Sequence, residues 1–193
     1  MEKYLFLDMD GVLNSRQHIL NWYNEHGGYS LENRKLFAKE FKNCTKLVFP
    51  DLVNRLNNFL TETEINVILS SSWRLIDEYN TLRKIKTKFK KLGIYTNNFI
   101  GVTPDFRRFS NFRDGTRGPR AIEIKDWLET NKISLDSKII IFDDDYVNEK
   151  IICNSGYKNC KLFQTSNLTG ISDEDILNAK LFLILHFKYK VIN

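Results

Sequence analysis

Short apolar runs alternate with longer stretches of mixed polarity along this chain. The clearest runs occupy residues 3–7, 65–69 and 138–142, and each stops abruptly at polar or acidic residues. Runs of this length, rich in Ile, Leu, Val and Phe, are typical of buried parallel strands. Weaker runs at 99–102 and 161–163 predict two further short strands. We expect the first run to form a central strand of the sheet.

Between these runs, apolar residues recur with the spacing typical of helices. After Pro50, apolar residues recur at i, i+3 and i+4, and proline is acceptable in the first turn of a helix. Further helices are predicted over residues 79–92, ending at Gly93, after Pro119, and after Ser172, whose side chain can cap the helix that follows. Because strands alternate with helices, the sequence predicts an α/β domain with a parallel sheet.

Length and composition indicate one globular domain. A chain of 193 residues fits a single domain, 1–193, better than two. The hydrophobic share of 42% and the charged share of 27% are ordinary for globular proteins, which excludes the disordered and collagen-like classes. Residues 15–48 are polar and aromatic and follow neither pattern, so we expect them to form a small inserted cap.

The charge and the polar start of the chain bear on partners and location. The net charge of +5 mildly favours an anionic partner. No apolar run approaches the roughly 18 residues of a membrane-spanning helix, and acids interrupt the first ten residues. We therefore expect a soluble, cytoplasmic protein without a membrane partner. The 3 cysteines lack CxxC spacing, which argues against a disulfide framework or a zinc site.

Chemically active side chains follow three of the predicted strands. Asp-Met-Asp follows the first, Ser-Ser-Ser the second and Asp-Asp-Asp the strand at 138–142. Such residues also end strands for structural reasons, since they tolerate turns. Parallel strands end at one edge, however, and carboxylates crowded there repel one another unless a hard cation such as Mg²⁺ neutralises them. A calcium loop does not fit, because Gly11 is the fourth rather than the sixth residue and a strand precedes it.

In order, the segments FLDMDGVLN, VILSSSWR and IIIFDDD resemble the motifs of the haloacid dehalogenase superfamily of aspartyl-nucleophile phosphotransferases. With FPDLVNRLNNFL, RAIEIKDWLE and TSNLTGIS, they are similar to the haloacid dehalogenase (HAD) domain of Swiss Army Knife RNA repair proteins. The resemblance covers nearly the whole chain and leaves residues 15–48 and 74–117 unmatched. It implies a Rossmann-like, three-layer α/β/α sandwich with a small or minimal cap, and Mg²⁺ as the cofactor.

The resemblance assigns roles to the residues after the first strand. Asp8 would be the nucleophile, since an ionised carboxylate can attack phosphorus without losing a proton, and a role as a simple metal ligand is the alternative. Asp10 would give a proton to the leaving oxygen and later take one from water, and its backbone carbonyl would bind the metal. Gly11 would let the phosphate approach the backbone closely. Dehalogenases lack the second acid, so Asp10 favours phosphoryl transfer over carbon–halogen cleavage.

The second strand and the following loop supply expected phosphate contacts. The resemblance places a hydroxyl donor at Ser70, and Ser71 could add a backbone N–H or could cap the next turn. Arg74 would either brace acids or bind a substrate phosphate. The family's usual lysine is missing before the predicted helix at RAIEI. Arg120 is the expected substitute and Arg117 the fallback, against the alternative of a solvated arginine in a basic loop.

The acidic triplet after the strand at 138–142 completes the expected metal site. In this superfamily the second acid of the pair usually carries the metal. The resemblance therefore makes Asp144 the first choice and Asp143 the second, bound directly or through water, together with Asp8 and Asp10. Asp145 has capping of the following segment as its alternative role.

The segments outside the resemblance would choose the substrate. Residues 15–48 and 106–120 mix aromatic residues with arginines, which can stack bases and neutralise phosphates, or can form a cap's own core with a solvated basic face. We expect a Mg²⁺-dependent polynucleotide phosphatase acting on RNA or DNA ends in nucleic acid repair, with a 3′-phosphate as first choice, or on nucleotides. The alternatives are a small-molecule nucleotidase or sugar phosphatase, and a non-catalytic nucleic-acid-binding module that retains the fold.

Overall fold

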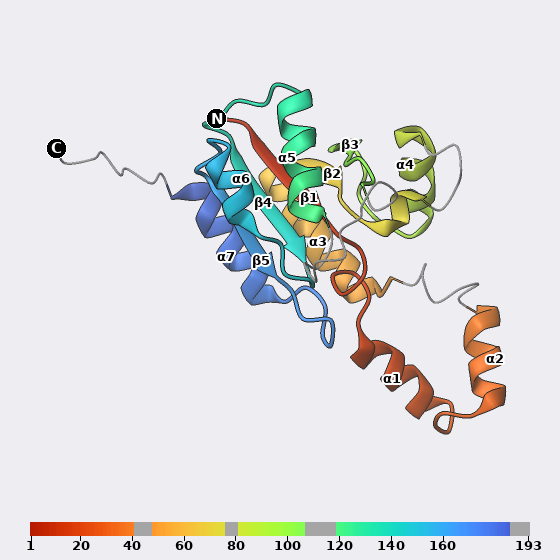
Figure 1. The fold of residues 1–193 in the computed structure, drawn as a ribbon. Coiled ribbons are helices and arrows are strands. Elements are labelled where there is room, and N and C mark those ends of the chain that lie inside the picture. Colours follow the sequence, from red (N-terminus) through yellow and green to blue (C-terminus); the bar gives the residue numbers. More distant parts are fainter. Residues whose placement is uncertain (41–47, 76–80, 107–118, 186–193) are drawn as a thin grey trace.

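Parallel strands form the centre of the fold. The computed structural model describes residues 1–40, 48–75, 81–106 and 119–185. Its strands pair in the order β3-β2-β1-β4-β5 (Figure 1), all parallel. They are β1 (Lys3–Leu7), β2 (Asn66–Leu69), β3 (Phe99–Val102), β4 (Lys138–Asp143) and β5 (Cys160–Gln164). In register, Leu7 lies opposite Leu69 and Phe142, so β1, β2 and β4 end together.

Helices cover both faces of this sheet. Leu5 and Leu7 of β1 face a core shared with α3 (Pro50–Thr63), α4 (Leu82–Lys91) and α7 (Asp173–Ile184). Tyr4 and Phe6 face the opposite core, with α5 (Arg120–Thr130) and α6 (Glu149–Asn154). The result is the expected Rossmann-like α/β/α sandwich with a central parallel sheet.

The predicted elements agree with the structure except at their ends. The strands at 3–7 and 99–102 are confirmed to the residue, and the other three differ by one or two residues. The basic helix predicted over 79–92 begins later, because Thr81 accepts a hydrogen bond from the backbone of Lys84 and caps the helix. Ser172 forms the expected cap, with Asp175 bonding back to its backbone.

Residues 15–48 contain a helical hairpin that the sequence pattern did not predict as helices. It consists of α1 (Arg16–Glu25) and α2 (Leu31–Glu40), and it extends away from the sheet at the lower right of Figure 1. Trp22, Tyr23 and Phe37 form a small core of its own, separate from the cores on the sheet. Phe49 packs on both this core and that of α3, which anchors the hairpin to the domain.

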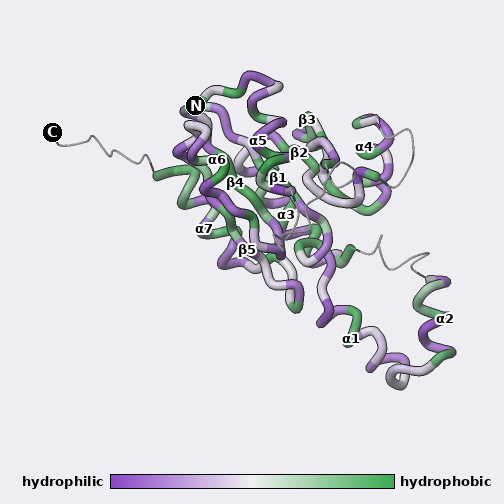
Figure 2. The backbone as a smooth tube through the Cα atoms, in the orientation of Figure 1, coloured by the Kyte–Doolittle hydropathy of each residue, from purple (hydrophilic) through white to green (hydrophobic). Residues whose placement is uncertain are grey.

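The distribution of hydrophobic residues follows this layering. Figure 2 shows hydrophobic segments gathered in the central strands and hydrophilic ones on the outer loops and helices. Among the described residues, no helix combines the length and the apolar character needed to cross a membrane.

Candidate active site

The ends of β1, β2 and β4 bring the candidate residues to one edge of the sheet. The backbone N–H of Asp8 donates to Phe142 at 2.9 Å, and that of Ser70 donates to Leu7 at 2.8 Å. These bonds continue the sheet pairing one residue beyond the strands. Asp8 therefore lies between the end of β2, which carries Ser70, and the end of β4, which carries Asp143.

Three carboxylates cluster at this edge. Asp8, Asp143 and Asp144 each offer an oxygen, and these atoms lie within 4.8 Å of one another. Asp8 and Asp143 are buried, at 7% and 1% exposure, whereas Asp144 is half-buried. The Asp10 carboxylate is not part of this cluster; its expected ligand atom is the backbone carbonyl.

Burial and mutual repulsion raise the proton affinity of the cluster. Burial raises the pKa of Asp143 to about 8, with repulsion from Asp8 adding to the effect. Burial, followed by repulsion from Asp8 and Asp145, raises the pKa of Asp144 to about 6. Burial also raises the pKa of Asp8, although Arg120 and a hydrogen bond from Ser71 oppose the rise. Buried, all-oxygen ligands that repel one another fit a hard divalent cation such as Mg²⁺.

Gly11 makes room for this cluster. It has a φ of +67°, and a Cβ at this position would lie 2.3 Å from Cγ of Asp144. The Thr165 hydroxyl fixes the same turn by donating to the Gly11 carbonyl at 2.9 Å. The group that lies close to Gly11 is thus the Asp144 side chain rather than the expected phosphate. A larger residue at position 11 would push Asp144 away from Asp8.

Arg120 reaches the cluster from the first turn of α5. Its guanidinium donates to Ser70 Oγ at 3.3 Å and to Asp8 Oδ2 at 3.4 Å, and its Nε lies 3.6 Å from Asp143 Oδ2. Burial alone would lower the pKa of Arg120, but the carboxylates of Asp8 and Asp143 outweigh it and raise the pKa. The positively charged Arg120 guanidinium therefore lies among the acidic side chains. The alternative of a solvated arginine in a basic loop does not describe this position. Arg117, the fallback, lies outside the described residues.

Arg74 faces inward from η2 (Ser72–Leu75), a 3₁₀ turn after β2. It is 5% exposed and pairs with Glu123 Oε2 of α5 at 2.8 Å. It also donates to the carbonyls of Ser71 at 2.8 Å and Pro104 at 3.0 Å. Of the two expected roles, this geometry is that of a brace between the β2 loop and α5. Glu123 is one turn beyond Arg120, so the brace fixes the turn that carries it.

Asp10 is held by residues that sequence reasoning did not connect with it. Trp73 Nε1 donates to its Oδ1 at 3.0 Å and Asn14 Nδ2 donates to the same atom at 2.9 Å. Trp73 is 4% exposed, so it packs in the interior and also directs its ring N–H at Asp10. Ser71, which is buried, accepts from the Trp73 backbone N–H at 3.3 Å, as a cap does. Its hydroxyl is also hydrogen-bonded to Asp8.

One known protein family matches most of the chain. The family model described as the HAD domain in Swiss Army Knife RNA repair proteins matches residues 4–176. No curated protein and no solved structure matches the chain. The matched range contains every described strand except the first residue of β1, Lys3, and includes each of the site residues above, so the chain belongs to the family of HAD domains in Swiss Army Knife RNA repair proteins.

Proposed function

We propose that the protein is a Mg²⁺-dependent phosphomonoesterase that works through an aspartyl-phosphate on Asp8 and acts on nucleic-acid ends, with a 3′-phosphate as the first choice. The family consists mainly of hydrolases, and its description refers to RNA repair. The observation that carries the proposal is the cluster of Asp8, Asp143 and Asp144 around one edge, with the Arg120 guanidinium 3.4 Å from Asp8.

The metal would be held by the oxygens of this cluster. Asp8 and Asp144 would bind it directly, Asp143 directly or through water, and the Asp10 carbonyl would add a ligand. When bound, Mg²⁺ would neutralise the carboxylates and withdraw charge from the phosphoryl oxygens. Its binding would also offset the effects of burial and of repulsion, which raise the pKa values of Asp143 and Asp144.

The chain's own residues would carry out the first step. Asp8 attacks phosphorus through a carboxylate oxygen, the P–O bond to the leaving group breaks, and Asp8 becomes an aspartyl-phosphate. The Ser70 hydroxyl and the Arg120 guanidinium, 3.3 Å apart, would both contact the phosphoryl oxygens. Arg120 would do here what the family's lysine does, holding the phosphate against the negative nucleophile.

Asp10 would transfer the protons of both steps. Its carboxylic acid protonates the leaving oxygen as the ester bond breaks. The resulting carboxylate then takes a proton from the water that attacks the aspartyl-phosphate, which frees phosphate and restores Asp8. The missing lysine is the feature that would favour the non-catalytic alternative. Because Arg120 already contacts Asp8 and Ser70, the geometry favours catalysis.

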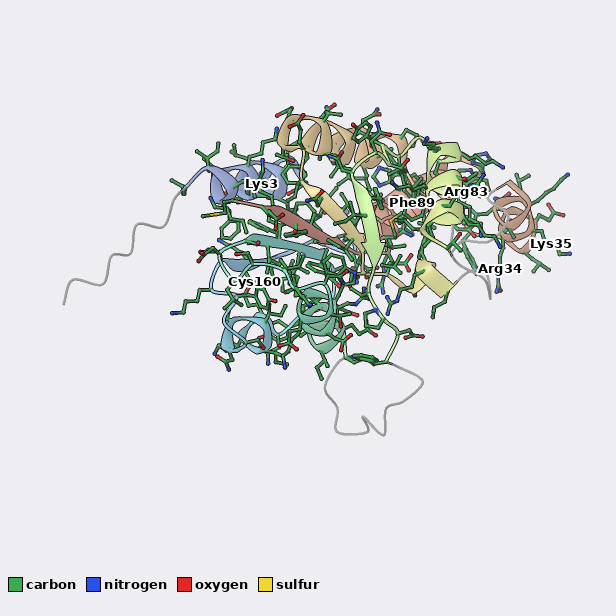
Figure 3. All side chains as sticks on the ribbon, turned by 90° about the horizontal axis from the view of Figure 1, so that it is seen from above. Lys3, Arg34, Lys35, Arg83, Phe89 and Cys160 are labelled. Atoms are coloured by element: carbon green, nitrogen blue, oxygen red, sulfur yellow. The ribbon has the colours of Figure 1, made fainter. Side chains whose placement is uncertain are left out.

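A basic surface near the site favours a polymeric substrate. Helix α4 carries exposed Arg83, Lys90 and Lys91, includes no acid, and packs through Phe89 on Trp73 with ring centroids 6.4 Å apart. Figure 3 shows Arg83 on the same side of the molecule as Arg34 and Lys35 of α2. Such a surface attracts the phosphates that follow the terminal one in a polynucleotide. We further propose that the α1–α2 hairpin serves as the small cap of a single domain.

Phosphate release with and without Mg²⁺ tests the proposal. The substrates are 3′- and 5′-phosphorylated oligonucleotides, mononucleotides, a sugar phosphate and p-nitrophenyl phosphate, each with wild type and Asp8→Asn. We expect Mg²⁺-dependent turnover that Asp8→Asn abolishes, with the 3′-phosphorylated oligonucleotide hydrolysed most efficiently. Preference for a mononucleotide or sugar phosphate would assign a small-molecule phosphatase. Binding of oligonucleotides without any turnover would assign a binding module.

A further inference from the structure

The two carboxylate oxygens of Asp10 have different surroundings. Oδ1 accepts two N–H donors, from Trp73 at 3.0 Å and from Asn14 at 2.9 Å. Oδ2 lies 3.4 Å from the hydroxyl of Ser72, an exposed residue. An indole or amide N–H can only donate, whereas a hydroxyl can donate or accept. The contacts of Oδ1 therefore suit an oxygen without a proton, while those of Oδ2 tolerate one.

The donors to Oδ1 are themselves fixed by the fold. The Trp73 ring is 4% exposed and packs edge-on against Phe89 of α4. Asn14 accepts from the Gly11 backbone N–H at 2.8 Å through Oδ1, which leaves its Nδ2 facing Asp10. A displacement of Asp10 would break both bonds to its Oδ1. The orientation of its carboxyl plane is thus set by the η2 turn and by the loop after β1 together.

We propose that Trp73, assisted by Asn14, is a positioning residue that keeps Oδ1 of Asp10 as a permanent acceptor and assigns proton transfer to Oδ2. The inference rests on the proposed function and specifies how its acid–base step is aligned. As the ester P–O bond breaks and the bond from Asp8 to phosphorus forms, the proton on Oδ2 passes to the leaving alcohol. In the second step Oδ2 takes back one proton from the attacking water, and the other remains on the phosphate released.

This role predicts a dependence on the leaving group. An alkoxide, as from a nucleoside 3′-phosphate, needs a proton as it departs, whereas p-nitrophenolate departs without one. The value of kcat/KM reports the steps through formation of the aspartyl-phosphate, so comparing it for the two esters isolates proton donation. Damage to packing or to Asp8 would reduce both values alike.

The experiment measures kcat/KM for p-nitrophenyl phosphate and for a nucleoside 3′-phosphate in Trp73→Phe, which keeps an aromatic ring and removes the N–H. We expect the ratio of the two values to shift against the 3′-phosphate by about ten-fold or more, a fraction of the roughly 10²–10⁴-fold that a general acid contributes. Phe89→Leu is the matched control, because it disturbs the same packing without touching Asp10. Phe89→Leu should leave the ratio of the two kcat/KM values unchanged, however much it lowers the stability of the protein.

A second readout does not depend on activity. The indole N–H resonance of Trp73 should shift in the NMR spectrum of Asp10→Asn, while those of Trp22 and Trp127 stay in place. An equal loss on both esters in Trp73→Phe, or an unmoved Trp73 resonance, would overturn the positioning role and leave the proposed function standing. Absence of phosphate release from either ester by the wild type would overturn both.

Discussion

Replacing Gly11 by alanine tests how the turn after β1 makes room for the acidic cluster. A Cβ at this position would lie 2.3 Å from Cγ and 2.5 Å from Oδ2 of Asp144. The φ of +67° alone costs an L-residue about 1–2 kcal/mol. Overpacking adds about 1–3 kcal/mol unless Asp144 moves away from Asp8. We therefore expect Gly11→Ala to lower the free energy of unfolding by about 2–5 kcal/mol or to displace a metal ligand.

Gly27 provides the matched control. Its φ is +86°, and nothing lies within 4 Å of the position of its Cβ. Gly27→Ala therefore introduces backbone strain without a collision, and we expect it to cost about 1–2 kcal/mol. The difference between the two variants measures the contact with Asp144.

Urea unfolding and calorimetric titration with Mg²⁺ measure both effects of these substitutions. Gly11→Ala should weaken Mg²⁺ binding by about 10–100-fold, the range found when residues that orient metal ligands are changed. Gly27→Ala should bind Mg²⁺ as the wild type does. If Gly11→Ala is no less stable than Gly27→Ala and binds Mg²⁺ equally well, the close approach of Asp144 has no role in the site.

The remaining predictions concern pH, a buried lysine and the basic helix. The folded-state pKa values of Asp143 and Asp144 are raised to about 8 and about 6, so the folded protein binds more protons than the unfolded chain in this pH range. The contribution of the two protonated carboxyl groups to the free energy of unfolding is complete below about pH 4 and is lost as pH rises toward 8. Without Mg²⁺, Tm should thus fall from pH 5 to pH 8, and Mg²⁺ should raise Tm more at pH 8; equal increments at both pH values would contradict this. The Lys138 ammonium donates to the carbonyls of Phe182, Leu183 and Leu185 at 3.2, 2.6 and 3.0 Å. Lys138→Met should therefore lower the free energy of unfolding by about 1–3 kcal/mol and speed hydrogen exchange in α7. Lys150 is exposed, and Lys150→Met should change neither quantity. Neutralising three of the exposed basic residues of α4 together, by Arg83→Gln, Lys90→Gln and Lys91→Gln, should raise KM for an oligonucleotide and reduce the salt dependence of KM. Hydrolysis of p-nitrophenyl phosphate is the control, and an unchanged salt dependence would exclude this helix from substrate binding.

The sheet and the convergence of its strand ends could be predicted because both depend on local sequence. The three strands that carry the site, β1, β2 and β4, each contain a continuous apolar run, and parallel strands end at the same edge of their sheet. The positions of Asp8, Ser70 and Asp143 follow from this rule alone. Helices α1 and α2 escaped prediction because most of their surface is exposed and their small core offers no long apolar repeat.

The contacts between side chains could not be predicted in the same way. Trp73 meets Asp10 and Arg74 meets Glu123 across sequence separations of 63 and 49 residues. Such pairs depend on how η2 crosses the loop after β1 and the first turn of α5, which no local pattern specifies. The signal available was only the presence of Trp-Arg directly after the serines, together with a glutamate one turn beyond Arg120.

The most direct test of the central claim is to trap the phosphorylated enzyme. Wild type turning over p-nitrophenyl phosphate with Mg²⁺ is quenched in acid, any acyl phosphate is reduced with borohydride, and the modified residue is located by peptide mass spectrometry. The account predicts homoserine at position 8, and more of it in Asp10→Asn, which lacks the base for the second step. Turnover without modification at position 8, or modification at another acid, would contradict Asp8 as the nucleophile.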